Sequence, residues 1–81
     1  MVQPGQIYRH YKGKEYKILT TAKLEATLED VVVYEGQYED TEFGKHPVWV
    51  RPLSSFMEIV QIEKDNGQIE TIRRFTQVGS R

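Results

Sequence analysis

The sequence predicts an all-β domain, a small barrel of five or six strands with one short helical turn. Three observations lead to this fold class: β-branched and aromatic residues gather in short runs, glycine and proline separate the runs, and no run is long enough for a helix that is stable alone. The 81 residues are too few for a two-sheet sandwich, so a bent sheet that closes on itself best protects its edge strands. We expect one domain, with residues 6–76 in the barrel, a flexible leader at 1–5 and a flexible tail at 77–81.

A β-hairpin is the first element that the sequence predicts, with strands at residues 7–11 and 14–19. The dipeptide Lys12-Gly13 between them suits a two-residue hairpin loop. This loop length sets Ile7 opposite Ile18, and the pattern favours the face with both isoleucines as the inward face.

The next part of the chain predicts further extended structure. Residues 20–28 contain helix-favouring alanine and leucine, yet these also alternate with a period of two, and we favour an extended conformation. Residues 30–35 give the strongest strand signal, because three consecutive valines are unfavourable in a helix and a continuous apolar run is typical of a central strand. The acidic stretch 35–47 is expected to form a loop or a splayed hairpin end.

Three short elements are expected after the acidic stretch. Residues 48–51 form a strand that Pro52 stops, because proline has no N–H for a ladder. Residues 53–57 fit one helical turn with the proline at its start. Residues 58–63 and 68–75 then predict a second hairpin with a four-residue loop, since a bare Asn-Gly loop would place two glutamates opposite each other.

Composition argues against several kinds of protein. The absence of cysteine leaves no disulfide framework and no thiolate for metal binding or catalysis, and it suits a reducing compartment. The N-terminal residues are polar and lack the apolar core of a signal peptide, and no stretch approaches the length of a membrane span. We therefore expect a cytoplasmic protein that does not contact a membrane.

Charge is nearly balanced overall, at −1, but it is distributed unevenly. Residues 1–20 carry +3, residues 21–47 carry −5 and residues 48–81 carry +1. Two patches of opposite sign follow if the fold keeps these segments apart, and the charges neutralise each other if it brings them together.

Several sequence blocks occur in the order and spacing of one family. Between Pro4 and Phe75 they are PGQIYRHYKGKEY, TLEDVVVY, YE, VWVRP, FMEIV and RRF. The chain thereby resembles the DUF1653 family, small bacterial proteins of unknown function, and YRHYKG and WVRP are the most specific blocks. The resemblance implies an SH3-like β-barrel and no established activity.

The chain departs from the family pattern before its valine-rich strand. Where the family usually has Ala-x-His-Ser-Glu-Thr-x-Glu, this chain has Leu24, Glu25 and Ala26 in place of the His-Ser-Glu trio. Any chemistry that depended on that histidine or serine is absent here. The loop before Trp49 is also several residues longer than the family's usual loop.

Positive charge and aromatic rings are concentrated in the first hairpin. Its cations are Arg9, Lys12, Lys14 and Lys17, and Tyr8 and Tyr11 lie among them. Such a surface can neutralise phosphates while tyrosines stack on bases, as in small-barrel nucleic-acid binders. The alternative is a solvated hairpin whose lysines keep a sheet edge soluble, and the balanced overall charge favours this alternative.

Trp49 and Arg51 lie two residues apart, so on a strand they project to the same face. With Tyr8, Tyr34, Tyr38 or Phe56 nearby, they could line an aromatic groove for a peptide, as SH3-like barrels often provide. The alternative is that Trp49 is a core anchor, which is common for a lone tryptophan.

No arrangement of residues indicates a reaction or a metal site. His10 and His46 are not in a metal-ligand spacing. The dipeptide Ser54-Ser55 is expected to cap the helical turn rather than to act as a nucleophile, because no base is placed beside it. We therefore expect no enzymatic activity, no cofactor and no metal.

The hypothesis that follows is a non-enzymatic module that binds a peptide or protein through Tyr8, Trp49 and Arg51. The alternative partner is nucleic acid, bound by the basic hairpin. Together, the expected binding residues are Tyr8, Arg9, Tyr11, Lys12, Trp49 and Arg51.

Overall fold

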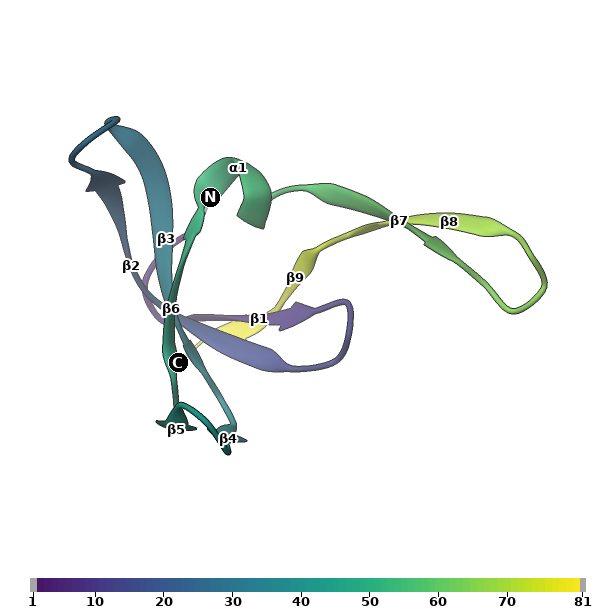
Figure 1. Ribbon diagram of the computed structural model, residues 1–81, viewed down its shortest axis with the longest axis horizontal. Coiled ribbons are helices and arrows are strands. Elements are labelled where there is room, and N and C mark those ends of the chain that lie inside the picture. Colours follow the sequence, from purple (N-terminus) through teal and green to yellow (C-terminus); the bar gives the residue numbers. More distant parts are fainter. Residues whose placement is uncertain (1, 81) are drawn as a thin grey trace.

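Strands make up most of the structure, a computed structural model that describes residues 2–80 (Figure 1). In chain order the elements are β1 (Gln6–His10), β2 (Glu15–Leu24), β3 (Glu29–Gly36), β4 (Glu39–Asp40), β5 (Gly44–Lys45), β6 (Val48–Pro52), α1 (Leu53–Phe56), β7 (Ile59–Glu63), β8 (Ile69–Arg73) and β9 (Phe75–Ser80). The expected all-β class and the short helical turn are confirmed. No helix within residues 2–80 has the length and apolar character needed to cross a membrane.

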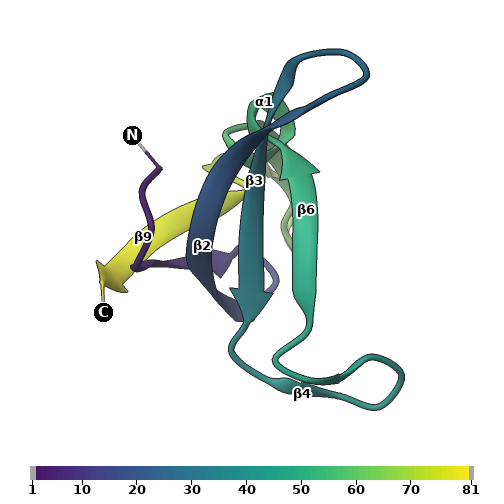
Figure 2. The ribbon, with the colours of Figure 1, turned by 90° about the vertical axis from the view of Figure 1, so that its left-hand side faces the viewer.

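Five antiparallel strands form the main sheet, in the order β6-β3-β2-β1-β9. The sheet bends strongly: in Figure 2, β2, β3 and β6 stand upright while β1 and β9 run across them. Strands β6 and β9 occupy the two edges and do not pair with each other. The described strands therefore form an open, bent sheet, and the closed SH3-like barrel expected from the sequence is not confirmed.

The hydrophobic core packs between α1 and the bent sheet. Phe56 of α1 is 1% exposed, and its ring stacks on the ring of Phe75, the first residue of β9. The rings of Tyr8 and Tyr34 meet Phe56 edge-on, with centroids 5.1 and 5.5 Å away. One phenylalanine thus contacts rings from β1, β3 and β9, and these contacts hold the three strands together.

The register of the first hairpin differs by one residue from the expected register. Tyr8 pairs with Tyr16 and Ile7 pairs with Lys17, so the expected pairing of Ile7 with Ile18 is wrong. A one-residue slip moves each side chain of a strand to the other face. Tyr8, Tyr16 and Ile18 consequently share the inward face, although Ile7 is also buried.

Glycine is the physical cause of this shift, and it acts in the same way in the second hairpin. Each loop has three residues and ends on a glycine with positive φ, +112° at Gly13 and +82° at Gly67. The N–H of Gly13 donates to the carbonyl oxygen of His10 at 2.8 Å, and that of Gly67 to Lys64 at 2.9 Å. A glycine in this conformation forms a bulge that adds one residue to a two-residue turn. The expected two-residue and four-residue loops are therefore both wrong.

Strands β7 and β8 form a separate two-stranded sheet, which we call the arm, and it projects from the main sheet (Figure 1). Its register places Ile62 opposite Glu70, not opposite Ile69 as a four-residue loop would require. At its base, the N–H of Arg74 donates to the carbonyl oxygen of Glu58 at 2.9 Å, and the side chains of these two residues form an ion pair.

The two ends of the chain take part in the fold. Val2 is 7% exposed and belongs to the core, and β9 continues to Ser80, which pairs with Gln6. The expected leader and tail therefore include packed and paired residues, and their flexibility stays a prediction. Residues 1 and 81, at the outer ends of these segments, lie outside the described residues.

The alternating stretch after the first hairpin is extended, as expected, as far as Leu24. It then turns through residues 25–28, where Leu28 has a φ of +62°. The acidic stretch that follows β3 contains the small β4–β5 hairpin, in which Glu39 pairs with Lys45. The expectation of a hairpin end at this point is confirmed.

Candidate functional site

A groove of about 520 Å³ lies between the tip of the first hairpin and strands β3 and β6. This volume falls within the usual range of ligand-binding pockets. Five aromatic residues line the groove, namely Tyr16, Tyr34, Tyr38, Trp49 and Phe75. Four side chains that can carry positive charge also line it, namely His10, Lys12, Lys14 and Arg51.

Strand alternation brings these side chains together. Trp49 and Arg51 are two residues apart on β6 and therefore share a face. Tyr34 on β3 is directly paired with Trp49, so its ring lies on the same face. Tyr16 on β2 meets Tyr34 edge-on, with ring centroids 5.2 Å apart. The groove wall is thus a row of rings that crosses three neighbouring strands.

A short chain of hydrogen bonds fixes the rings at one end of the groove. The indole N–H of Trp49 donates to the hydroxyl oxygen of Tyr38 at 3.1 Å, and that hydroxyl donates to the hydroxyl oxygen of Tyr16 at 3.3 Å. Burial raises the pKa of Tyr16, so its hydroxyl stays neutral at physiological pH. These rings are therefore an uncharged, oriented wall.

Neutral partners hold Arg51 in the groove. Its Nε donates to the hydroxyl oxygen of Tyr34 at 3.2 Å, and its Nη1 donates to the hydroxyl oxygen of Ser55 at 3.0 Å. The guanidinium carbon lies 5.6 Å from the ring centroid of Phe75. Within residues 2–80 no carboxylate forms an ion pair with Arg51. Its charge is oriented but not neutralised.

The lysines at the hairpin tip add further positive charge. The ammonium nitrogen of Lys14 lies 4.3 Å from the ring centroid of Tyr38, a cation–π contact. Lys12 also lines the groove. Among residues 2–80 no aspartate or glutamate lines the groove, so the charged side chains that line it are cationic.

His10 contributes a neutral ring to the groove. Its Nδ1 accepts a hydrogen bond from the backbone N–H of Lys12 at 3.1 Å, and its ring stacks on the ring of Tyr11. Burial, together with the nearby charges of Arg51, Arg74 and Lys12, lowers the pKa of His10. A protonated Nδ1 could not accept this hydrogen bond, so the observed contact also favours the neutral ring.

The structure brings together three of the six expected binding residues. Lys12, Trp49 and Arg51 line the groove. Tyr8 instead lies in the core at 8% exposed. Arg9 points away from the groove and forms an ion pair with Glu15, with Nη2 and Oε2 2.7 Å apart.

Tyr11, the remaining expected residue, lies next to the groove but does not line it. Of the other hairpin cations, Lys14 lines the groove, and Lys17 pairs with Ile7 on the face away from it. The one-residue shift in register explains the place of Arg9, because Tyr8 and His10 of β1, rather than Ile7 and Arg9, now share the inward face with Tyr16 and Ile18.

Sequence analysis did not name several groove residues. His10 shares the inward face with Tyr16 only when the loop has three residues, whereas Tyr16 lies on the face of Ile18 in either register. Gly13 was the indication of a three-residue loop in the sequence, because a glycine in the third position of a hairpin loop is typical of this bulged turn. Phe75 and Ser55 reach the groove from elements that lie far along the chain from the first hairpin, and no local pattern indicated this.

The expected role of the serines after Pro52 is wrong. Helix α1 has no side-chain capping hydrogen bond, and Ser55 instead accepts a hydrogen bond from Arg51. Within residues 2–80 no group of three or more histidine, cysteine, aspartate or glutamate side chains is placed to hold a metal ion. His46 lies apart from His10, with its Nδ1 3.1 Å from the carbonyl oxygen of Gly36.

A family model described as "Protein of unknown function (DUF1653)" matches residues 6–77. The crystal structure of a protein of this family from Bordetella bronchiseptica is similar to the chain, with 34% identical residues and a TM-score of 0.73. The similarity covers 98% of this chain and 90% of that protein. Among curated proteins, none matches the chain significantly.

Proposed function

The chain belongs to the DUF1653 family, and from this premise we propose that it is a non-enzymatic binding module whose groove holds an acidic segment of a peptide or protein. The observation that carries the proposal is the charge of the groove, which Lys12, Lys14 and Arg51 line without a carboxylate from any described residue. Rings beside unneutralised cations suit a ligand with both carboxylates and apolar side chains.

Arg51 is the proposed anchor for a ligand carboxylate. Its hydrogen bonds to Tyr34 and Ser55 orient the guanidinium without neutralising it. Arginine binds carboxylates through a planar fork of N–H groups, and an arginine that is already oriented loses less side-chain entropy when the ligand arrives. This preorganisation favours a carboxylate at the centre of the groove.

Strand β6 offers an extended ligand a place to align. It lies at the edge of the main sheet and pairs on one side only, with β3. A ligand segment added along the free side would gain backbone hydrogen bonds and point alternate side chains towards Trp49 and Arg51. Pro52 ends β6 and cannot donate a hydrogen bond, so the added strand would be short.

Nucleic acid is the weaker candidate partner. The groove rings could stack on bases as well as pack against apolar side chains. However, the cations of the first hairpin lie on two faces, and Arg9 is already paired with Glu15. A protein with a net charge of −1 also lacks the overall basic character that nucleic-acid binders usually have.

The same proposal includes a bacterial, cytoplasmic setting and the absence of catalysis. The cysteine-free composition supports a reducing compartment. The one groove hydroxyl outside the tyrosines, that of Ser55, accepts a hydrogen bond from Arg51 rather than donating to a base. This contact supports a positioning role and not a nucleophilic one.

Fluorescence polarisation with three labelled probes tests the proposal. The probes are an acidic ten-residue peptide of glutamates and phenylalanines, the same peptide with lysines in place of the glutamates, and a decauridylate. We expect the acidic peptide to bind tightest, with an affinity that falls as salt is added, because the contact is largely electrostatic. The Arg51→Gln variant should weaken this binding about tenfold or more, since a charged hydrogen bond is lost.

Arg9→Gln is the matched control, because it removes the same charge from the face away from the groove and should change the affinity less than about twofold. Equal affinities of the wild-type and Arg51→Gln chains for the acidic peptide would contradict the proposal. If the decauridylate bound more tightly than the acidic peptide, nucleic acid would be the favoured partner instead.

A further inference from the structure

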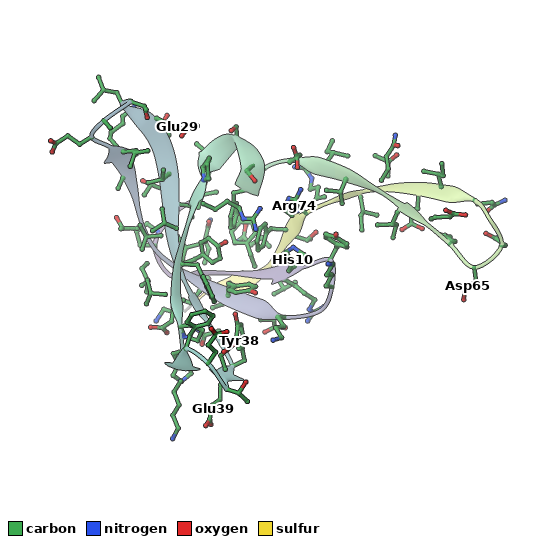
Figure 3. All side chains as sticks on the ribbon, viewed as in Figure 1. His10, Glu29, Tyr38, Glu39, Asp65 and Arg74 are labelled. Carbon is green, nitrogen blue, oxygen red and sulfur yellow. The ribbon has the colours of Figure 1, made fainter. Side chains whose placement is uncertain are left out.

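The arm packs less against the rest of the fold than the strands of the main sheet do. In Figures 1 and 3 it projects away from the main sheet and α1, and its two strands pair only with each other. An isolated two-stranded ribbon is only marginally stable in water. A surface that covered the arm would therefore stabilise it.

The whole molecule exposes more area than a compact chain of its size. A compact monomer of 9.5 kDa exposes about 5,000 Å², whereas this chain exposes 5822 Å². The radius of gyration is 13.9 Å, compared with about 12 Å for a compact chain of this length. The excess area, roughly 800 Å², is close to the area that each partner contributes to a standard protein interface.

One face of the arm consists of three exposed rows of side chains. Residues that are directly paired in a hairpin share a face, so the rows are Ile59 with Arg73 at the base, Gln61 with Thr71 in the middle, and Glu63 with Ile69 at the tip. The isoleucines are unusually accessible, at 58% exposed for Ile59 and 68% for Ile69. Within residues 2–80, Arg73 and Glu63 take part in no ion pair.

We propose that a second copy of this chain covers this face, in a dimer whose two-fold axis passes through the middle row. The rotation makes the two arms antiparallel, so that the base row of each copy lies against the tip row of the other. The four side chains at each end of the interface are then neighbours, with Ile59 diagonally across from the partner's Ile69 and Arg73 diagonally across from the partner's Glu63. The face is thus self-complementary in both hydrophobicity and charge, which an isologous interface requires.

The charges of Arg73 and Glu63 provide a test whose expected result differs between a dimer and a monomer. Along the arm, the rows of Arg73 and Glu63 are four residues apart, or about 13 Å. Exchanging the two charges therefore creates no new direct pair within one chain. In the proposed dimer, however, the exchange restores an opposite-charge contact across the interface.

Sedimentation equilibrium of the full chain, over a series of concentrations, measures the association. We expect the wild-type chain to show a reversible monomer–dimer equilibrium. Arg73→Glu alone and Glu63→Arg alone should each weaken the dimer about tenfold or more, because like charges then face each other. The double variant should recover the wild-type dissociation constant to within about threefold.

Lys45→Glu is the matched control, because it changes the net charge as much as Arg73→Glu does but lies on β5, outside the arm. It should leave the dimer unchanged. A wild-type chain that stays monomeric at every concentration overturns the proposal. So does a double variant that associates no better than the single variants.

Amide hydrogen exchange of the wild-type chain keeps the proposal testable if a variant fails to fold. Protection of the β7 and β8 amides should rise with protein concentration, while protection of the β2–β3 pair should not. Arm protection that is independent of concentration would contradict the dimer, even if the arm binds some other protein.

Discussion

The ring of Phe56 lies face to face with the ring of Phe75, with centroids 4.2 Å apart and planes inclined by 7°. This contact joins α1 to the start of β9, and the edge strands β6 and β9 have no backbone pairing between them. Side-chain packing therefore joins the two edges of the sheet, which backbone hydrogen bonds would join in a closed barrel.

Replacing Phe56 by alanine should cause a large loss of stability. The side chain is 1% exposed and contacts rings from three strands. We expect the free energy of unfolding to fall by about 3–5 kcal/mol, as measured by urea denaturation. Met57→Ala, at a position that is 44% exposed, is the control and should cost less than about 1 kcal/mol. Similar costs for both variants would contradict the proposed role of Phe56.

The loop glycines should resist substitution because of their backbone conformation. A Cβ at Gly13 or Gly67 would meet nothing within 4 Å, but both residues have positive φ. Alanine at either position should lower the free energy of unfolding by about 1–2 kcal/mol. Gly79→Ala tests the argument, because that glycine also has open space but no positive φ, and its replacement should be nearly neutral.

Removal of the Tyr38 hydroxyl should affect both of its partners. Tyr38→Phe leaves the indole N–H of Trp49 without its acceptor and should cost about 1–2 kcal/mol of stability. It should also change the alkaline titration of Tyr16, because the hydroxyl that donates to Tyr16 is lost while the burial of Tyr16 remains. An alkaline absorbance titration measures this change.

Tyr11→Phe serves as the control for stability, since within residues 2–80 the Tyr11 hydroxyl has no hydrogen-bond partner. It should leave the free energy of unfolding almost unchanged. If the Tyr38→Phe variant shows the same Tyr16 titration as the wild-type chain, the Tyr16–Tyr38 hydrogen bond does not form in solution.

Stability should fall as the solution is acidified below pH 6.5. Burial, followed by the charges of Arg51, Arg74 and Lys12, lowers the pKa of His10 from its model-compound value of 6.5. The unfolded chain then binds a proton that the folded chain resists, so stability present above pH 6.5 is lost as the pH falls through the lowered value. Urea denaturation at a series of pH values measures this slope, which should be shallower in a His10→Gln variant. An unchanged slope would show that other groups cause the acid sensitivity.

Much of the fold could be predicted from local patterns. The valines of β3, the proline that ends β6 and the glycines between strands mark where elements begin and end. The pairing could not be predicted to the residue, because a hairpin loop of two, three or four residues changes the register by one each time. The closure of the barrel depends on how far the sheet bends, and no local pattern encodes this.

The candidate site was predicted where it depends on one strand only. Trp49 and Arg51 share a face under any register, since they are two residues apart on β6. The contribution of the first hairpin depended on its register, so Arg9 was expected at the site while His10 was not. The sequence also predicted the strands of the arm without showing that they project from the main sheet.

The pairing of β1 with β9 joins residues as far apart as Gln6 and Ser80. During synthesis on the ribosome, β1 is made well before its edge partner β9, because β2 to β8 and α1 are made between them. The β2–β3 pair can form earlier, since its two strands are neighbours in the chain. We therefore expect the pairing of β1 with β9 to be a slow step of folding, because it joins residues that lie far apart in the sequence.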